Sequence, residues 1–355
     1  MFELNLQNKK LTAEALLHES IFDLVWTKQE AQVIRLCHLW LTGCNEFEFR
    51  TSGSTGVPKT ITLSREQLKA SAAATIAVLG LNASDHALLC LPAETIAGSM
   101  MAVRAMLLNI PLTVVEPSVD VLPRMDAQHP FTFSAFIPAQ LYNVKNQTAV
   151  FNKFKHVLVG GAGISQEMED VQRGMKPRIY HTYGMTETAS HIAWRELHTH
   201  TRFMPLPGIE LKTDGRGCLC IKGDVTQQQW IVTNDVVELT TDGFIVKGRA
   251  DYAINTGGVK VHPEEVEKIL AACEPLHNKH FFITGLPHPQ WGQQVVLILE
   301  GQKPLTENEW EMLCMRVSEI AGKYAAPKRC IMIHSFVMST SGKINRPATI
   351  NSLNV

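Results

Sequence analysis

A loop of nine residues, TSGSTGVPK at positions 51–59, constrains this chain more than any other segment. Its hydroxyl-bearing, glycine and lysine residues are Thr51, Ser52, Gly53, Ser54, Thr55, Gly56 and Lys59. Glycines let backbone N–H groups turn toward an anion, hydroxyls add short donors, and a lysine brings a mobile positive charge. The loop therefore indicates a polyphosphate ligand. A short cluster of this kind taken alone is more often a surface turn.

The flanking residues predict that this loop joins two strands. Residues 47–50 and 60–63 alternate in the manner of strands, and a helix is expected only from Ser64, where Ser64 and Gln67 match a capping box. Pro58 stands where the Walker pattern needs a glycine. The segment is therefore a different kind of phosphate loop.

Length, charge and cysteine content limit the number of domains, the kinds of partner and the redox state of the thiols. A chain of 355 residues predicts about two domains. With 33 basic and 34 acidic side chains the formal net charge is −1, so no overall field favours nucleic acid or an anionic membrane as a partner. The eight cysteines lack the spacing of a zinc site and are expected to be reduced thiols. No secretory signal or membrane span is evident, which predicts a cytoplasmic protein.

Strands and helices alternate after the loop, which predicts a large wound α/β domain. The expected strands are 86–91, 110–116, 131–137, 156–161 and 178–183, and the expected helices include 64–81 and 98–109. A small β subdomain is expected from about residue 210 to residue 247, with separate strands at 229–233 and 236–239. A small α+β domain follows it. We place the N-terminal domain at residues 1–248 and the C-terminal domain at residues 249–355.

A second segment, YGMTET at positions 183–188, offers groups for a nucleotide and its metal. The Tyr183 ring can lie on a base, the Thr186 hydroxyl can bond phosphate oxygens, and Glu187 can hold Mg²⁺ that bridges those oxygens. Taken alone, the segment would more often be a turn at a strand end. Its position downstream of the loop at 51–59 favours a site.

These two segments resemble signatures of the adenylate-forming superfamily, which contains acyl-CoA synthetases, firefly luciferase and peptide-synthetase adenylation domains. Five such signatures occur in the family's order between Phe49 and Arg346. The resemblance implies that a carboxylate attacks ATP with release of pyrophosphate, and that the acyl group then passes to a thiol. ATP, Mg²⁺ and coenzyme A are the implied cofactors.

The resemblance also implies which residues bind the nucleotide and coenzyme A. The implied residues are Thr51, Ser52, Gly53, Ser54, Thr55, Gly56, Lys59, Gly160, Gly161, Ala162, Tyr183, Gly184, Asp235, Arg249, Gly257 and Gly258. The glycine loop at 160–163 would admit adenine, although a plain turn is an equal interpretation. Asp235 and Arg249 would bind the ribose hydroxyls, whereas by themselves they would more often form a surface ion pair.

The same resemblance implies catalytic roles for Thr186, Glu187 and Lys343. Lys343 would lie between the attacking carboxylate and the α-phosphate, where its charge offsets the developing negative charge. Asp251 matches the family's hinge, about which the C-terminal domain rotates between the two half-reactions. Any interdomain linker would contain a similar short polar residue.

Within the superfamily, residues 91–104 and 186–191 look most like those of the o-succinylbenzoate–CoA ligases of menaquinone biosynthesis. That substrate is a diacid of which one carboxylate is activated, so a cation should neutralise the other. Arg104 interrupts an apolar run, and Ser190 and His191 could bond carbonyl groups of the substrate.

Alternatives to each of these assignments stay open. Arg104 could pair with a protein carboxylate such as Glu94, and His191 could be a satisfied core histidine. Glu94 and Thr95 replace an aromatic–His pair of the family, which leaves the pantetheine path open.

Rival functions also stay open. The first is a CoA ligase, or a carrier-loading adenylation enzyme, for another aryl or short-chain acid. The second is an ATP-binding regulatory protein without turnover. The implied partners are a small carboxylic acid and CoA, with no nucleic acid and no membrane span. A homodimer is an open possibility by analogy with relatives.

Overall fold

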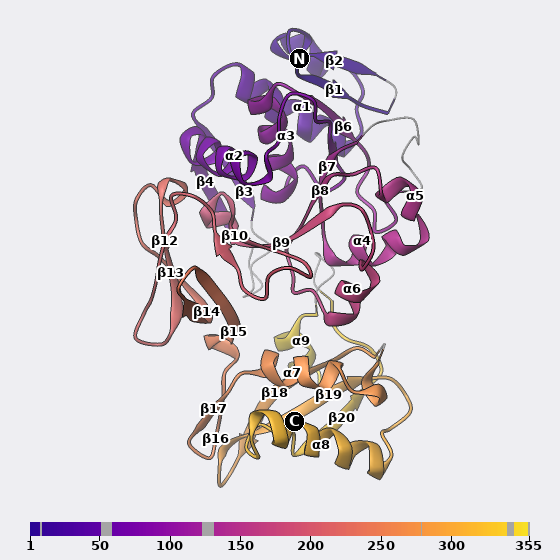
Figure 1. The fold of residues 1–355 in the computed structure, drawn as a ribbon, viewed down its shortest axis with the longest axis vertical. Helices are drawn as coiled ribbons and strands as arrows, with labels where there is room; N and C mark the ends of the chain where they lie inside the picture. Colours follow the sequence, from indigo (N-terminus) through magenta and orange to yellow (C-terminus); the bar gives the residue numbers. More distant parts are fainter. Residues whose placement is uncertain (8, 51–58, 123–130, 278, 339–343, 354–355) are drawn as a thin grey trace. The chain divides into compact units, whose positions relative to one another are not determined.

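The computed structural model describes residues 1–7, 9–50, 59–122, 131–277, 279–338 and 344–353 (Figure 1). The chain divides into two compact units. Unit 1 comprises Met1–Leu211, Ile221–Ile231 and Thr240–Phe244, and unit 2 comprises Lys212–Cys220, Val232–Leu239 and Ile245–Val355. The predicted domain boundary between residues 248 and 249 stays a prediction.

Unit 1 is built around a sheet that has nine strands among the described residues, in the order β11-β10-β9-β8-β7-β5-β6-β1-β2. These strands are β1 (Glu3–Asn5), β2 (Lys10–Thr12), β5 (Ala87–Leu89), β6 (Pro111–Val114), β7 (Phe133–Phe136), β8 (His156–Val159), β9 (Arg178–Met185), β10 (Ser190–Glu196) and β11 (Met204–Pro205). The strands from β9 to β1 pair in parallel, and the outer strands β2, β10 and β11 pair antiparallel. The predicted wound α/β class is therefore confirmed.

Helices cover this sheet because their apolar faces must be buried. The helical segments of unit 1 are η1 (Ala15–Leu17), η2 (Glu19–Asp23), α1 (Lys28–Leu41), α2 (Arg65–Leu79), α3 (Ile96–Leu108), α4 (Pro138–Asn143), η4 (Val144–Asn146), α5 (Thr148–Phe151), α6 (Gln166–Val171), η5 (Thr186–Thr188) and η6 (Asp224–Thr226). Helix α3 contacts both α1 and α2, and Figure 1 shows α1 and α3 side by side.

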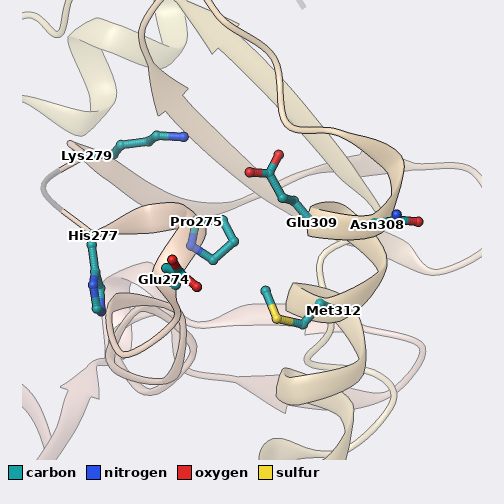
Figure 2. Close-up of a pocket in the computed structure, with 7 residues that line it drawn as sticks. All are labelled: Glu274, Pro275, His277, Lys279, Asn308, Glu309 and Met312. Atoms are coloured by element: carbon teal, nitrogen blue, oxygen red, sulfur yellow. The ribbon is translucent and has the colours of Figure 1, made fainter.

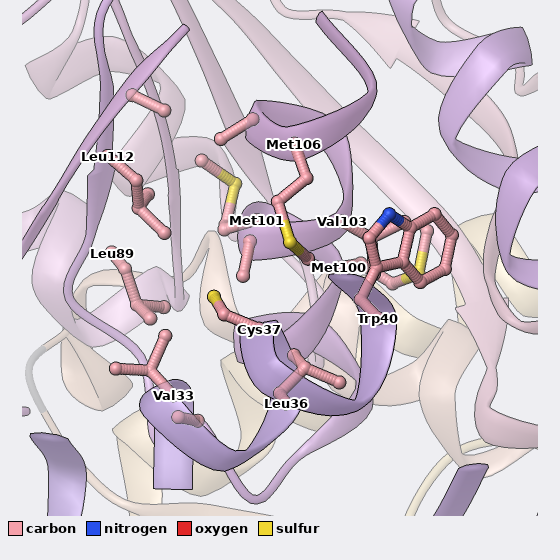
Figure 3. Packing of buried hydrophobic residues seen from close by; sticks show 14 of the residues in the cluster. Val33, Leu36, Cys37, Trp40, Leu89, Met100, Met101, Val103, Met106 and Leu112 are labelled. Carbon is pink, nitrogen blue, oxygen red and sulfur yellow. The ribbon is translucent and has the colours of Figure 1, made fainter. Parts of the chain in front are cut away.

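The core of unit 1 lies between these helices and the sheet. Figure 3 shows Cys37 of α1, Met101 of α3, Leu89 of β5 and Leu112 of β6 in this core, and all four side chains are fully buried. Burying a large apolar side chain contributes about 1.5–3 kcal/mol. Because α3 is apolar on nearly all sides, it is an interior helix, and any charged residue on it is buried with it.

The two strands predicted on either side of residues 51–59 are present. Strand β3 (Glu46–Arg50) pairs antiparallel with β4 (Thr60–Ser64). The predicted capping box begins α2: the Ser64 N–H donates to Gln67 Oε1 at 3.0 Å, and the Gln67 N–H donates to Ser64 Oγ at 3.2 Å. Helix α2 ends at Gly80, whose φ is +65°.

A small four-stranded sheet, in the order β12-β13-β14-β15, forms the expected β subdomain. Its strands are β12 (Glu210–Thr213), β13 (Cys218–Lys222), β14 (Ile231–Thr240) and β15 (Gly243–Arg249). The predicted separation into two strands, 229–233 and 236–239, is wrong, because residues 231–240 form the single strand β14. Pairing with two neighbours holds Asn234 and Asp235 in extended backbone despite their turn propensity.

Unit 2 contains a five-stranded sheet flanked by helices, as the predicted α+β class requires. Its strands are β16 (Ile254–Thr256), β17 (Val259–Val261), β18 (Phe281–His288), β19 (Gly292–Glu300) and β20 (Arg329–Ile333), and its helical segments are η7 (Ala250–Tyr252), α7 (Pro263–Ala271), η8 (Glu274–Leu276), α8 (Glu307–Ala321) and α9 (Arg346–Asn351). Leu270 of α7 and Leu313 of α8 are fully buried in the same core as Leu297 of β19.

Two predictions that concern the whole chain can be compared with the structure. The eight cysteines carry free thiols, and Cys37, Cys90, Cys218 and Cys220 are buried. Across the described ranges, each helix is too short or too polar to cross a membrane.

Candidate active site

Arg104 is a buried cation in the interior of unit 1. It lies on α3, and only 2% of its surface is exposed. Burial lowers the pKa of Arg104 to about 9, so the side chain is still protonated at neutral pH. No carboxylate of the described residues lies at ion-pair distance from its guanidinium. The alternative that Arg104 pairs with Glu94 is wrong: Glu94 contacts Lys28 at 3.0 Å and Gln32 at 2.7 Å.

The guanidinium of Arg104 is only partly satisfied by its neighbours. Its Nη2 donates to Ser190 Oγ at 3.4 Å and to His191 Nδ1 at 3.5 Å, and Nη1 lies 4.0 Å from Met101 Sδ. The buried Nε has no hydrogen-bond partner among the described residues. A buried cation with an unused donor is costly, and an anion would offset that cost. The predicted residues Arg104, Ser190 and His191 therefore come together.

Strand β10, which carries Ser190 and His191, was not predicted. It pairs antiparallel with β9 through a tight connection, and Ala189 in that connection has a φ of +53°. Left-handed backbone is unusual for alanine and is retained only where the surrounding structure requires it. The short apolar run Ile192–Trp194, which contains a β-branched and an aromatic residue, was the available signal for this strand.

Gly184 of β9 lies opposite His191 and allows the two strands to approach closely. An added Cβ at Gly184 would lie 2.2 Å from the carbonyl oxygen of Ser190 and 2.3 Å from the Cα of His191. Both contacts are with backbone, which cannot rotate away as a flexible side chain would. Gly184 thus allows Ser190 and His191 of β10 to lie against β9.

The Gly184→Ala substitution is expected to lower the free energy of unfolding by about 2–4 kcal/mol, because β9 and β10 must separate to admit the methyl group. Urea unfolding measures this change. Gly163→Ala is the matched control, since the position of its added methyl group is open; its expected effect is below about 0.5 kcal/mol. Equal urea midpoints for the two variants would contradict the close approach.

The predicted adenine loop follows β8 and is held by a buried histidine of β9. Arg195 Nε donates to His181 Nδ1 at 3.2 Å, and Glu169 pairs with the same arginine. His181 Nε2 must therefore carry the proton that it donates to the Ala162 carbonyl at 3.1 Å. Burial, with a smaller contribution from Arg195, lowers the pKa of His181 to about 4, so the ring is neutral.

Gly160 at the start of this loop also permits a close approach. Thr182 Oγ1 donates to the Val159 carbonyl at 3.1 Å and would lie 2.5 Å from a Cβ at Gly160. Gly161 follows with a φ of +86°, a conformation that favours glycine. Gly160, Gly161 and Ala162 are thus anchored beside the end of β9.

Tyr183, Thr186 and Glu187 follow one another at the end of β9 and in η5. The Tyr183 ring contacts Phe203 and Phe244, with centroid distances of 5.8 Å and 5.1 Å. Within the described residues no group of three or more metal-ligating side chains occurs. That the resemblance assigns Mg²⁺ to Glu187 stays a prediction; phosphate oxygens would supply further ligands, which is the usual way in which proteins bind this ion.

In unit 2 the predicted ribose residues form ion pairs. Arg249 Nη1 lies 3.4 Å from Asp235 Oδ1, and its Nε and Nη2 donate to Asp251 at 2.9 Å and 2.8 Å. The bonds to Asp251 are the main cause that raises the pKa of Arg249 above its usual value. The predicted hinge carboxylate is thus bound to the predicted ribose-binding arginine. Gly257 and Gly258 both have positive φ, at +56° and +81°.

Unit 2 also has a cavity of about 530 Å³ on its surface (Figure 2). The lining residues are Glu274, Pro275, His277, Lys279, Asn308, Glu309 and Met312. None of the predicted site residues lines it. Glu309 is already engaged in the capping box of α8, where its carboxylate accepts the N–H of the N-cap residue Thr306 at 2.7 Å.

Comparison with known proteins agrees with this geometry. Residues 50–224 match the family model described as AMP-binding enzyme. A solved acyl-CoA synthetase (AMP-forming)/AMP-acid ligase II-like protein from Dyadobacter fermentans is 36% identical, over 93% of this chain and 95% of that chain, with a TM-score of 0.61. The chain belongs to the adenylate-forming family of AMP-binding enzymes.

More distant members of this adenylate-forming family carry the name of a specific ligase. The 2-succinylbenzoate–CoA ligase of Escherichia coli K12 is 27% identical over 334 residues, which cover 89% of this chain and 69% of the relative. The o-succinylbenzoate coenzyme A synthetase of Bacillus subtilis, solved with ATP and a magnesium ion, is 22% identical over 85% of this chain and 69% of that chain. Its TM-score of 0.75 shows a shared fold.

Some residues of the family signatures lie outside the part of the chain that the structure describes. Thr51, Ser52, Gly53, Ser54, Thr55, Gly56 and Lys343 lie outside the described residues. Lys59 is described: it is exposed and directly precedes β4. The roles that the resemblance implies for all these residues stay predictions.

One buried polar residue that contacts His191 was missed by sequence reasoning. Thr75 of α2 is 1% exposed, and its Oγ1 lies 3.3 Å from His191 Nε2. A lone threonine in an apolar helix carries no pattern that would single it out.

Proposed function

We propose that this protein is an ATP- and Mg²⁺-dependent acid–CoA ligase whose acid is o-succinylbenzoate. The observation that supports this most strongly is Arg104, a buried cation whose Nε–H is unused and which Ser190 and His191 flank. A diacid supplies the missing anion and still has a second carboxylate available for reaction. A monoacid that reacts through its only carboxylate would leave Arg104 without a counter-charge.

In the first half-reaction, a carboxylate oxygen of the acid attacks the α-phosphorus of ATP, and the bond to pyrophosphate breaks. The Thr186 hydroxyl bonds phosphate oxygens, and Lys343 offsets the charge that develops between the two anions. Glu187 would hold Mg²⁺, which would supply positive charge to offset that of the phosphates. The products are an acyl-adenylate and pyrophosphate.

In the second half-reaction, the thiolate of coenzyme A attacks the acyl carbon and AMP leaves. The chain's own contribution at the acid end is orientation. Arg104 holds the carboxylate that does not react, and the Ser190 hydroxyl donates to an oxygen of the acid. A fixed acid keeps its activated carbonyl in one place through both steps.

A substrate comparison tests the proposal. We expect o-succinylbenzoate to support both pyrophosphate release and CoA consumption. The matched control is 4-oxo-4-phenylbutanoate, which lacks only the ring carboxylate. Its kcat/KM is expected to be lower by at least about 100-fold, because the buried donors of Arg104 would stay unpaired.

Other acids in the same assay separate the rival ligases. Turnover of benzoates or fatty acids without turnover of o-succinylbenzoate would reject the proposed acid. Pyrophosphate release without CoA consumption, restored by a carrier-protein thiol, would identify a carrier-loading adenylation enzyme.

A further inference from the structure

We infer that Thr75 is a positioning residue that holds His191 in its Nε2–H tautomer, so that the Nδ1 lone pair faces Arg104. The residues come from three elements of unit 1: Thr75 from α2, Arg104 from α3 and His191 from β10. The inference deepens the proposed function, on which it depends only for the name of the acid.

The first constraint on the His191 tautomer comes from the hydroxyl of Thr75. That hydroxyl donates its single proton to the Ser71 carbonyl, four residues earlier on α2, at 2.9 Å. Toward His191 Nε2, at 3.3 Å, Thr75 Oγ1 can therefore only accept. Nε2 must carry the hydrogen.

The second constraint comes from the opposite side of the ring. His191 Nδ1 lies 3.5 Å from Arg104 Nη2, and a guanidinium has donors but no acceptor. Nδ1 must therefore present a lone pair. Two neighbours that are unrelated in sequence require the same tautomer.

The charge state of the ring agrees with this arrangement. Burial, and then the charge of Arg104, lower the pKa of His191 well below its usual value, so the ring is neutral. A cationic imidazole would direct an N–H at the guanidinium and leave two donors facing each other.

The consequence for binding is a preoriented guanidinium. His191 and Ser190 hold Nη2 of Arg104, while Nε–H keeps no acceptor among the described residues. The orientation of Arg104 toward a carboxylate is therefore set before the ligand arrives, which reduces the entropy cost of binding. Without the Thr75 acceptor, the His191 ring gains freedom to take the Nδ1–H form, which would repel Arg104.

Histidine-selective ¹⁵N NMR on the full-length protein tests the tautomer directly. The His191 signals among those of the 14 histidines are assigned by their loss in His191→Gln. We expect a neutral ring protonated at Nε2 at pH 7, without any ligand. A ring protonated at Nδ1, or at both nitrogens, would overturn the inference.

Thr75→Val tests the role of the hydroxyl, because valine has nearly the same shape and no acceptor. We expect the single tautomer to be lost and the KM for the acid to rise about 5- to 10-fold, with the KM for ATP and kcat within about two-fold of wild type. Thr75→Ser is expected to restore both readouts. An unchanged tautomer together with an unchanged KM in Thr75→Val would refute the role.

The two proposals fail in different ways. If the wild-type protein does not turn over o-succinylbenzoate, the proposed acid is wrong, while the NMR spectrum still decides the tautomer, and KM is then measured with the acid that is turned over. Should Thr75→Val not fold, the wild-type spectrum still tests the His191 tautomer, and the Thr75→Ser variant still tests the role of the hydroxyl.

Discussion

Replacing Arg104 with methionine is expected to raise the KM for o-succinylbenzoate by about 100- to 1,000-fold and to make the unliganded protein more stable. The loss of binding follows because a buried charge-assisted contact disappears. The gain in stability, about 1–3 kcal/mol, follows because a buried cation without a carboxylate partner is replaced by an apolar chain of similar length. A purely structural arginine would give the opposite sign.

The stability gain of Arg104→Met should be present at neutral pH. Because burial lowers the pKa of Arg104 to about 9, the unfolded chain binds more protons than the folded chain only above that pH. Wild-type stability should therefore gain a contribution as the pH rises above about 9, and the full cost of the charge applies below it. Arg104→Met should lack this contribution.

Pyrophosphate release at varied acid and varied ATP, with urea unfolding at pH 7, measures both effects. Arg104→Lys keeps the charge and should recover part of the binding. Glu94→Gln is a matched control, since Glu94 is exposed and contacts Lys28 and Gln32; its expected effect on either quantity is negligible. An unchanged KM for the diacid in Arg104→Met would remove Arg104 from the acid site.

Replacing Lys343 with alanine is expected to slow acyl-adenylate formation by at least about 100-fold, because one positioned charge near the reacting phosphate is lost. Transfer of the acyl group from a supplied acyl-adenylate to coenzyme A should stay within a few-fold of wild type. Single-turnover assays of the two half-reactions measure these rates separately.

Lys328→Ala provides the control for this second substitution. Lys328 is an exposed lysine of the same unit that donates to the Lys323 carbonyl, and both half-reactions should tolerate its loss. An equal loss of both half-reactions in Lys343→Ala would contradict the assigned role. Wild-type protein that binds ATP but forms an adenylate with no acid would instead favour the regulatory alternative.

Much of the fold could be predicted because its signals are local. Strand alternation on both sides of residues 51–59, the capping box at Ser64 and Gln67, and the alternating strands and helices of unit 1 all depend on neighbours a few residues apart. One misread segment was β14. There, turn propensity at Asn234 and Asp235 yields to pairing with strands on both sides, which no local pattern records.

Some features of the candidate site could likewise be predicted from local sequence patterns, and others depend on tertiary contacts. Motif order along the chain was enough to indicate an adenylate-forming enzyme, because phosphate and metal chemistry need particular residue types at short spacings. The sequence also singled out Arg104, since a cation within an apolar run must be compensated. It could not decide whether Glu94 or a ligand compensates that charge.

The amino-acid sequence by itself determined the family, the wound α/β class and the residue types of the site, since each depends on short-range patterns. Only the tertiary structure decided that Glu94 turns away to Lys28 and that Arg104 meets Ser190, which lies 86 residues further along the chain. Thr75 and His191, 116 residues apart, likewise meet only because α2, α3 and β10 pack together. A buried polar group takes its partners from whatever the packing brings to it, and packing is a property of the whole fold.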